Sequence, residues 1–222
     1  MRDADPCHAV GEMNTADVRH VLFDADGVLQ HLPGGWYAAA EPFLGESSEA
    51  FLHAAWALES PLLTGGDVDF VATLEGLLVE HGSSASTAEV YAAVWGTVET
   101  VAATAEVIRR VRTAGYGVHL GTNQAAHRSH LMRSTLGYDD LFDVSCYSYE
   151  LGVAKPDPSF FRRAADLIGS EPGEILFVDD SAKNVEGARS AGMSAIHWTL
   201  DVDDELAMAA LIAQLATHGV AL

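Results

Sequence analysis

The sequence is poor in basic residues. It holds 12 lysines and arginines against 32 aspartates and glutamates, which gives a formal net charge of −20 at pH 7. Nucleic-acid backbones and anionic membrane surfaces would be repelled by such a chain, so we expect neither as a partner. A small anionic ligand is not excluded, because it responds mainly to the charges of its own site.

Cysteines and long apolar runs are also scarce. The two cysteines, Cys7 and Cys146, form no CxxC pair, which argues against a structural zinc site and indicates a reducing compartment. We expect Cys146 to be a core thiol. No stretch reaches the roughly 18 apolar residues of a membrane-spanning helix, and residues 1–17 lack the apolar core of a signal peptide. These absences predict a cytoplasmic protein with a loose tail at residues 1–17.

Strand-like and helix-like segments alternate along much of the 222-residue chain. We expect strands at 18–24, 116–123, 142–149, 174–181 and 194–199, and helices at 102–113, 125–136, 158–168, 182–191 and 203–217. This alternation predicts an α/β fold, a Rossmann-like doubly wound parallel sheet with helices on both faces. Residues 31–99 instead have helical spacing throughout. They predict a small helical block, inserted as a cap into a core of residues 18–30 and 100–222.

Polar residues follow four of the predicted strands. Asp-x-Asp occurs four times in this acidic chain, so its spacing alone is weak evidence. The pair Asp24 and Asp26 differs because an apolar strand precedes it and Gly27 follows. The other strands are followed by Thr122 and Asn123, by Lys155, and by Asp179 and Asp180. The carboxyl ends of parallel strands lie along one edge of a sheet, so these side chains should meet there.

A cluster of carboxylates at that edge is destabilised by mutual repulsion and needs a nearby positive charge. It persists only if a cation occupies it or if some carboxyls are protonated. Carboxylate and carbonyl oxygens are ligands suited to Mg²⁺, and Lys155 adds a further positive charge. Thr122 and Asn123 can donate hydrogen bonds to an anion. The set predicts phosphoryl transfer, with Asp26 kept protonated by its acidic neighbours as a general acid.

These motifs resemble those of a known family. Their order and spacing are similar to the four motifs of the haloacid dehalogenase-like (HAD) hydrolase superfamily: Asp24-Ala25-Asp26-Gly27-Val28, Thr122-Asn123, Lys155-Pro156 and Asp179-Asp180-Ser181. The helical block resembles that superfamily's small C1-type cap. The segments GVAKPDPSFF and FVDDSAKNVEGARSAGM look most like the branch that holds sugar-phosphate phosphatases and the N-terminal phosphatase domain of epoxide hydrolases.

The resemblance implies a role for each matched residue. Asp24 would be the nucleophile that forms an aspartyl-phosphate, and Asp26 would be the acid/base. Thr122 and Lys155 would bind the phosphoryl group, while Asn123 would help to orient phosphate or substrate. Mg²⁺ would be held by Asp24, the main-chain carbonyl of Asp26, Asp180 and, directly or through water, Asp179. Asn184 stands where many members have another acid, which implies a supporting role.

The resemblance therefore implies a Mg²⁺-dependent hydrolase of a small phosphate monoester, such as a sugar phosphate. A phosphomutase similar to β-phosphoglucomutase shares every motif and stays an alternative, as does a non-catalytic module of the same fold. A dehalogenase is disfavoured, because a halide leaving group needs no proton and Asp26 is present. The oligomeric state is left open between monomer and homodimer.

Two further groups of residues have competing interpretations. His31, Trp36 and Tyr37 follow the first motif closely and either line the substrate site or pack the core against the helical block. Five arginines on predicted helices are interpreted as solvated surface: Arg109, Arg110, Arg112, Arg128 and Arg133.

Overall fold

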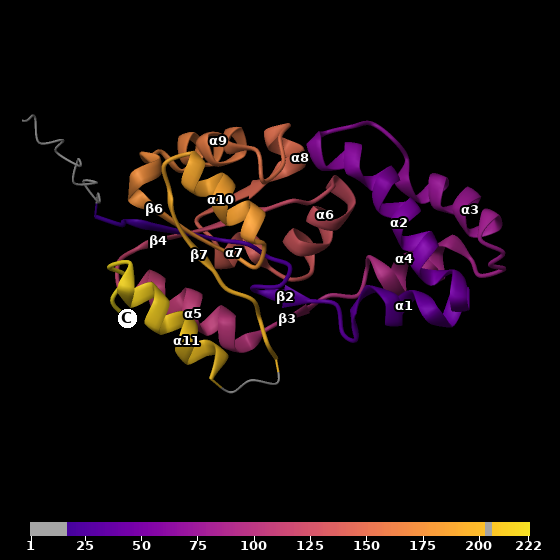
Figure 1. Cartoon of the computed structure of the whole chain (residues 1–222), viewed down its shortest axis with the longest axis horizontal. Coiled ribbons are helices and arrows are strands. Elements are labelled where there is room, and N and C mark those ends of the chain that lie inside the picture. The colour runs from indigo at the N-terminus through magenta and orange to yellow at the C-terminus, as the bar shows by residue number, and fades with distance from the viewer. Residues whose placement is uncertain (1–16, 203–205) are drawn as a thin grey trace, which may run out of the picture.

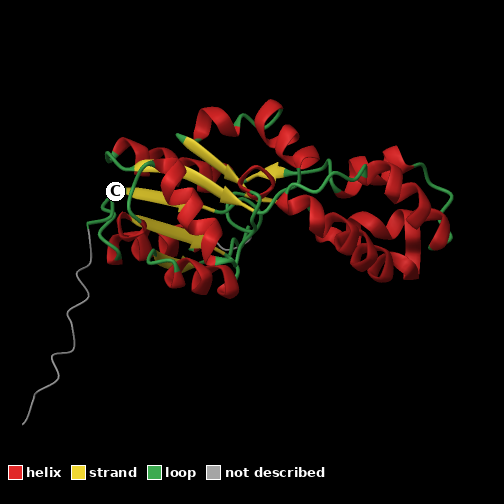
Figure 2. Ribbon diagram, turned by 90° about the horizontal axis from the view of Figure 1, so that it is seen from above, coloured by secondary structure: helices red, strands yellow, loops and turns green. Residues whose placement is uncertain are grey.

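The computed structural model describes residues 17–202 and 206–222. Residues 1–16 of the predicted tail, Cys7 among them, lie outside the described residues, as do positions 203–205 of the last predicted helix. A sheet flanked by helices forms one end of the molecule, and a cluster of helices forms the other (Figures 1 and 2).

The sheet confirms the predicted α/β architecture. Its five strands are parallel in the order β5-β4-β1-β6-β7, so the first strand of the chain lies at the centre. The strands are β1 His20–Phe23, β4 Gly117–Thr122, β5 Val144–Tyr147, β6 Ile175–Asp179 and β7 Ser194–His197. Each is shorter than the segment that the sequence predicted, because the residues at one or both ends of that segment lie outside the strand.

Helices cover both faces of this sheet (Figure 1). In β1, Val21 and Phe23 pack on one face and Leu22 on the other, as the two-residue period of a strand requires. The first face is covered by α5 Ala102–Thr113 and α11 Ala207–Thr217, and the second by α9 Pro158–Ile168 and α10 Ala182–Ser190. Two buried layers therefore fix the strand register and the positions of the strand ends.

Shorter helices complete the sheet end. The helix predicted at 125–136 is α6 Ala126–Ser134, and α7 Tyr138–Leu141 follows it. Gly137 separates them at a φ of 69°, a left-handed conformation that favours glycine. The strand predicted at 142–149 ends early, because α8 Ser148–Leu151 begins directly after β5. The one-turn 3₁₀ helix η3 Pro172–Glu174 precedes β6.

The helical block has its own apolar core. Its helices are α1 Gly35–Leu44, α2 Ser48–Glu59, α3 Phe70–Glu80 and α4 Thr87–Val94, with the 3₁₀ segments η1 Gly45–Ser47 and η2 Ser60–Thr64. Asp69 caps the start of α3, and a capping box of Ser86 and Glu89 starts α4. Trp95 is fully buried against Phe51 and Phe70 in this core.

A small ribbon joins the helical block to the sheet end. It pairs β2 Gln30–His31 with β3 Glu99–Thr100 in antiparallel fashion. Two-residue strands are too short to show an alternating pattern, which is why the sequence did not predict them. Among the described helices, none combines the length and apolarity needed to cross a bilayer.

Candidate active site

The carboxyl ends of three neighbouring strands build the site. Because β4, β1 and β6 lie side by side, Asn123, Asp24 and Asp179 come together in space. Gly27 turns the chain after β1 at a φ of 77°, and its Cα lies so close to the Asp180 carboxylate that a Cβ would overlap it. Glycine is therefore required at this turn.

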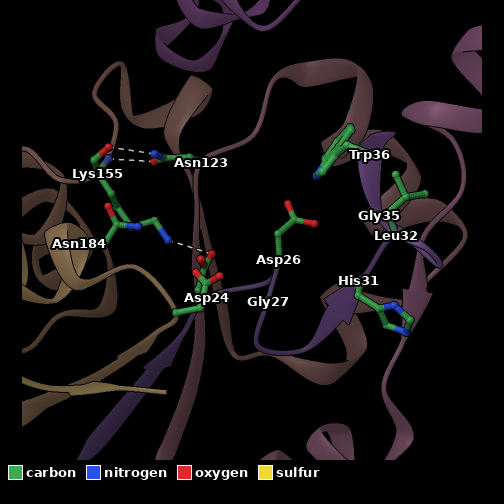
Figure 3. Close-up of a pocket in the computed structure, with 11 residues that line it drawn as sticks. Asp24, Asp26, Gly27, His31, Leu32, Gly35, Trp36, Asn123, Lys155 and Asn184 are labelled. Atoms are coloured by element: carbon green, nitrogen blue, oxygen red, sulfur yellow. Dashed lines mark hydrogen bonds and ion pairs between the residues drawn. The ribbon is translucent and has the colours of Figure 1, made fainter. Parts of the chain in front are cut away.

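Lys155 lies at the centre of the site (Figure 3). Its Nζ lies 2.8 Å from Asp24 Oδ1 and 2.7 Å from Asp179 Oδ2, and all three side chains are buried. Asn123 fixes the lysine's main chain: its Nδ2 donates to Lys155 O at 2.9 Å, and Lys155 N donates to its Oδ1 at 2.8 Å. Both amide atoms of Asn123 are therefore used to hold the Lys155 loop.

Three carboxylates converge around that lysine. Asp24, Asp179 and Asp180 each offer an oxygen within 4.8 Å of the others. Asp179 accepts hydrogen bonds from Ser181 N at 2.8 Å and from Asn184 Nδ2 at 2.9 Å. Within the described part of the chain, no side chain donates to Asp180, so its oxygens are available to a ligand.

The local charge is unbalanced, and the pKa values reflect this. Burial raises the pKa of Asp24 to about 8, with Asp179 adding to the rise and Lys155 opposing it. Burial, followed by the nearby charge of Asp179, also raises the pKa of Asp180. Burial alone would lower the pKa of Lys155, but the attraction of Asp24 and Asp179 raises it. One lysine against three carboxylates leaves a deficit that a divalent cation with oxygen ligands would fill.

Asp26 lies apart from Asp24, between it and Trp36 (Figure 3). Its partners are hydrogen-bond donors: Gln30 Nε2 at 2.9 Å, Gln124 Nε2 at 2.5 Å and the guanidinium of Arg128 at 3.1 Å. The sequence predicted acidic neighbours for Asp26, whereas its hydrogen-bond partners in the structure are two amides and a guanidinium. Donors of this kind orient the carboxyl group of Asp26.

The donors to Asp26 are themselves held in place. Tyr138 Oη donates to Gln30 Oε1 at 2.8 Å and lies 3.1 Å from the hydroxyl of Thr100 in the ribbon. Ser148 Oγ accepts from Gln124 N at 3.1 Å. Asp26 is thus connected through buried polar groups to the ribbon that joins the two ends of the molecule.

A cavity of about 410 Å³ opens between the strand ends and the helical block. Its lining includes Asp24, Asp26, Asn123, Lys155, Asp180 and Asn184, together with His31 and Trp36. Thr122 is buried and is not part of this lining, and Tyr37 is half-exposed and packs edge-on against Trp56. The structure therefore brings most of the predicted residues together but separates Thr122, Asp179 and Tyr37 from the cavity surface.

Sequence reasoning missed Gln30, Gln124 and Arg128. Arg128 was predicted to be solvated, but it is 5% exposed, and its guanidinium also lies 5.3 Å from the centre of the Trp36 ring. Its position on α6 alone does not distinguish it from Arg133, which is partly exposed and bonds to Glu150. Gln124 carried the clearer signal, because it directly follows the Thr122-Asn123 motif.

Two curated relatives match part of the chain. The phosphatase MT3486 of Mycobacterium tuberculosis is 40% identical over 91 residues, which is 40% of this chain and 41% of that protein. The sesquiterpene phosphatase astK of Aspergillus oryzae is 33% identical over 93 residues, 42% of this chain and 47% of that protein. The matches span less than half the length of each relative.

A solved structure and a family profile match most of the chain. The HAD family enzyme bt-2542 of Bacteroides thetaiotaomicron, solved with magnesium and inorganic phosphate, is similar with a TM-score of 0.68. It is 21% identical, and the match covers 85% of this chain and 96% of that one, which shows a shared fold. The profile of the haloacid dehalogenase-like hydrolases matches residues 18–192. The protein therefore belongs to the haloacid dehalogenase-like hydrolase family, as its four motifs predicted.

Proposed function

We propose that this protein is a Mg²⁺-dependent phosphatase that hydrolyses a small phosphate monoester through a covalent phosphate on Asp24. The observation that carries this proposal is the convergence of Asp24, Lys155 and Asp180 at a small cavity that Asp26 also lines. A nucleophile and an acid/base placed on opposite sides of a bound ester suit an in-line displacement.

In the first step, a carboxylate oxygen of Asp24 attacks phosphorus. The bond from phosphorus to the alcohol oxygen breaks, and that oxygen leaves with the electron pair and takes a proton from Asp26. In the second step, a water molecule gives a proton to Asp26 and attacks the same phosphorus. The bond to Asp24 then breaks, which releases inorganic phosphate and restores the carboxylate.

Other residues support these steps. Lys155 neutralises charge on the transferred group and holds Asp24 in position. A bound Mg²⁺ would be held by Asp24, Asp180 and the main-chain carbonyl of Asp26, with Asp179 close by, and would supply further positive charge. Thr122, at the end of β4, would donate a hydrogen bond to the phosphate, and it is buried in this structure. We assign Asn123 and Asn184 to positioning Lys155 and Asp179.

Asp26 must alternate between protonated and ionised forms. Gln30, Gln124 and Arg128 hold the carboxyl group in place, and its ionised form is the one that activates water in the second step. The side chain of Asp26 is 40% exposed, so it can take up a proton from solvent before the first step. The three donors would keep the carboxyl group directed at the leaving oxygen throughout.

Phosphate release from p-nitrophenyl phosphate and a panel of sugar phosphates tests this function. We expect release in the presence of Mg²⁺ and its loss on addition of EDTA. Interconversion of sugar phosphates in the presence of a bisphosphate primer, with little net release, would instead support the phosphomutase. Neither activity, with Mg²⁺ binding retained, would support the non-catalytic module.

A further inference from the structure

The helical block supplies one wall of the cavity, and that wall is apolar and aromatic. Its contributions are His31, Leu32, Gly35 and Trp36 (Figure 3). The indole of Trp36 packs edge-on against Trp56 and Trp95, with ring centres 6.0 and 6.3 Å apart. These contacts fix the indole, so the wall presents a rigid aromatic surface to whatever the phosphate is attached to.

The helical block is also strongly acidic. Residues 31–99 hold ten aspartates and glutamates, and every lysine and arginine of the chain lies outside this range. The imidazole of His31 faces a carboxylate, with its Nε2 3.9 Å from Glu99 Oε2. The net negative charge of the helical block, with Glu99 beside His31 of the lining, therefore disfavours a second anionic group on a ligand.

The cationic side chains described near the cavity, Lys155 and Arg128, already contact carboxylates. Lys155 contacts Asp24 and Asp179, and Arg128 contacts Asp26. A divalent cation beside Asp24 and Asp180 would be used for the reacting phosphate. A second phosphate or carboxylate, enclosed against Trp36 and Leu32, would have to lose its water without gaining a cation, which is costly.

We infer that the substrate is a monophosphate whose leaving group is uncharged and presents an apolar or aromatic surface to Trp36. This inference rests on the proposed phosphatase function and specifies its substrate class. It also disfavours the phosphomutase, because a bisphosphate intermediate needs a second phosphate site in which a cation or several donors hold the distal group.

Matched pairs of esters test the inference. One pair is phenyl phosphate and 4-carboxyphenyl phosphate, and another is glycerol 3-phosphate and 3-phosphoglycerate, each differing by one carboxylate. With Mg²⁺ present, we expect kcat/KM to be at least about 10-fold higher for the uncharged member of each pair, because of the uncompensated buried charge. Equal values within about 3-fold, or a preference for the charged member, would overturn the inference.

Variants of the wall sharpen the test. Leu32→Lys adds a cation to the lining, and we expect it to raise the kcat/KM ratio of 4-carboxyphenyl phosphate to phenyl phosphate by about 10-fold. Val79→Lys adds the same charge to the helical block at a position that is 74% exposed, and should leave that ratio unchanged. A ratio that rises equally in both variants, or in neither, would contradict the role assigned to the wall.

The two proposals fail in different ways. If neither these four esters nor p-nitrophenyl phosphate and the sugar phosphates release phosphate, the proposed function itself is wrong, and the substrate class is wrong with it. If phosphate is released equally from both members, the phosphatase stands and only the substrate class is overturned.

Discussion

The two sides of the cavity are built differently. On the sheet side, buried carboxylates, Lys155 and amide groups hold one another through hydrogen bonds of 2.7–2.9 Å. On the helical side, Trp36 and Leu32 contribute apolar surface in a segment rich in acidic residues. The sheet side, called the floor below, is rigid and charged, which suits a reaction at a fixed phosphoryl group. The helical side, the wall, is apolar, which suits selection among leaving groups. Four predictions follow from this division, from the largest effect to the smallest.

The nucleophile should be the most sensitive position on the floor. We expect Asp24→Asn to lower phosphate release by at least about 10³-fold, because the amide cannot form the covalent intermediate. Asp67→Asn alters another Asp-x-Asp pair, at an exposed position of the helical block, and serves as the matched control. Comparable losses in both variants would contradict the assignment of Asp24.

Arg128 connects the two sides, since it contacts Asp26 of the floor and Trp36 of the wall. We expect Arg128→Gln to lower kcat by about 10²-fold for an alkyl phosphate, whose leaving oxygen needs a proton from a well-placed Asp26. The loss should be much smaller for p-nitrophenyl phosphate, whose leaving group needs little protonation.

Two variants accompany that measurement. Arg128→Lys should restore part of the alkyl phosphate activity, because it keeps a positive charge beside Asp26. Arg133→Gln, on the same helix, removes a contact with Glu150 away from the cavity and should affect neither substrate selectively. An equal loss on both substrates in Arg128→Gln would indicate a structural role alone.

The stability of the protein should be sensitive to acid through His119, a residue of β4 outside the cavity lining. Burial, with the charge of His20 adding to it, lowers the pKa of His119 to about 4, and His20 Nδ1 lies 3.0 Å from His119 Nε2. The unfolded chain binds this proton near its ordinary pKa of about 6.5, so stability is present above that value and declines as the pH falls below it.

As the pH falls from about 7.5 to about 5, we expect protonation of His119 in the unfolded chain to lower the unfolding free energy by about 2 kcal/mol. This is roughly a 30-fold decrease in the folding constant. Urea unfolding at several pH values measures this. His119→Gln, which cannot take up the proton, should flatten the profile over that range. An unchanged slope in the variant would show that other groups cause the acid sensitivity.

The wall should affect binding more than chemistry. We expect Trp36→Ala to raise KM by about 10-fold for an aryl phosphate with a small change in kcat, because it removes aromatic contact area from the leaving group. Tyr37→Ala changes the next residue of α1, which lies outside the lining, and should leave KM unchanged. A larger effect on kcat than on KM would show that the wall also positions the reacting groups.

The sequence predicted the strands and helices well where apolar runs are long. The helices at 102–113 and 158–168 have the predicted bounds, because each begins and ends at clear signals such as Pro158 and Gly115. The ribbon of Gln30–His31 and Glu99–Thr100 was missed, because its pairing joins residues far apart in the chain. The short helix α7 Tyr138–Leu141 was not predicted, and the strand predicted to reach residue 149 ends at Tyr147, because α8 begins at Ser148.

The residues of the candidate site also fall into a group that the sequence predicted and a group that it did not. Asp24, Lys155, Asp179 and Asp180 could be found because each follows a strand and because parallel strands end at a common edge. The partners of Asp26 could not be found in this way. Gln124 precedes α6 and Arg128 lies in its first turn, and the sequence does not show which face of this helix meets Asp26. Gln30 lies in the ribbon that was not predicted.

The sequence by itself therefore determined the order of strands and helices, the excess of negative charge and the set of residues at the sheet edge. These depend on local periodicity and on the rule that parallel strands align their ends. Only the tertiary structure decided that Asp26 is surrounded by donors, that Arg128 is buried and that Trp36 faces the reacting groups. The contacts of Asp26 with Gln124 and Arg128 join segments about 100 residues apart, so their geometry depends on how distant parts of the chain pack together.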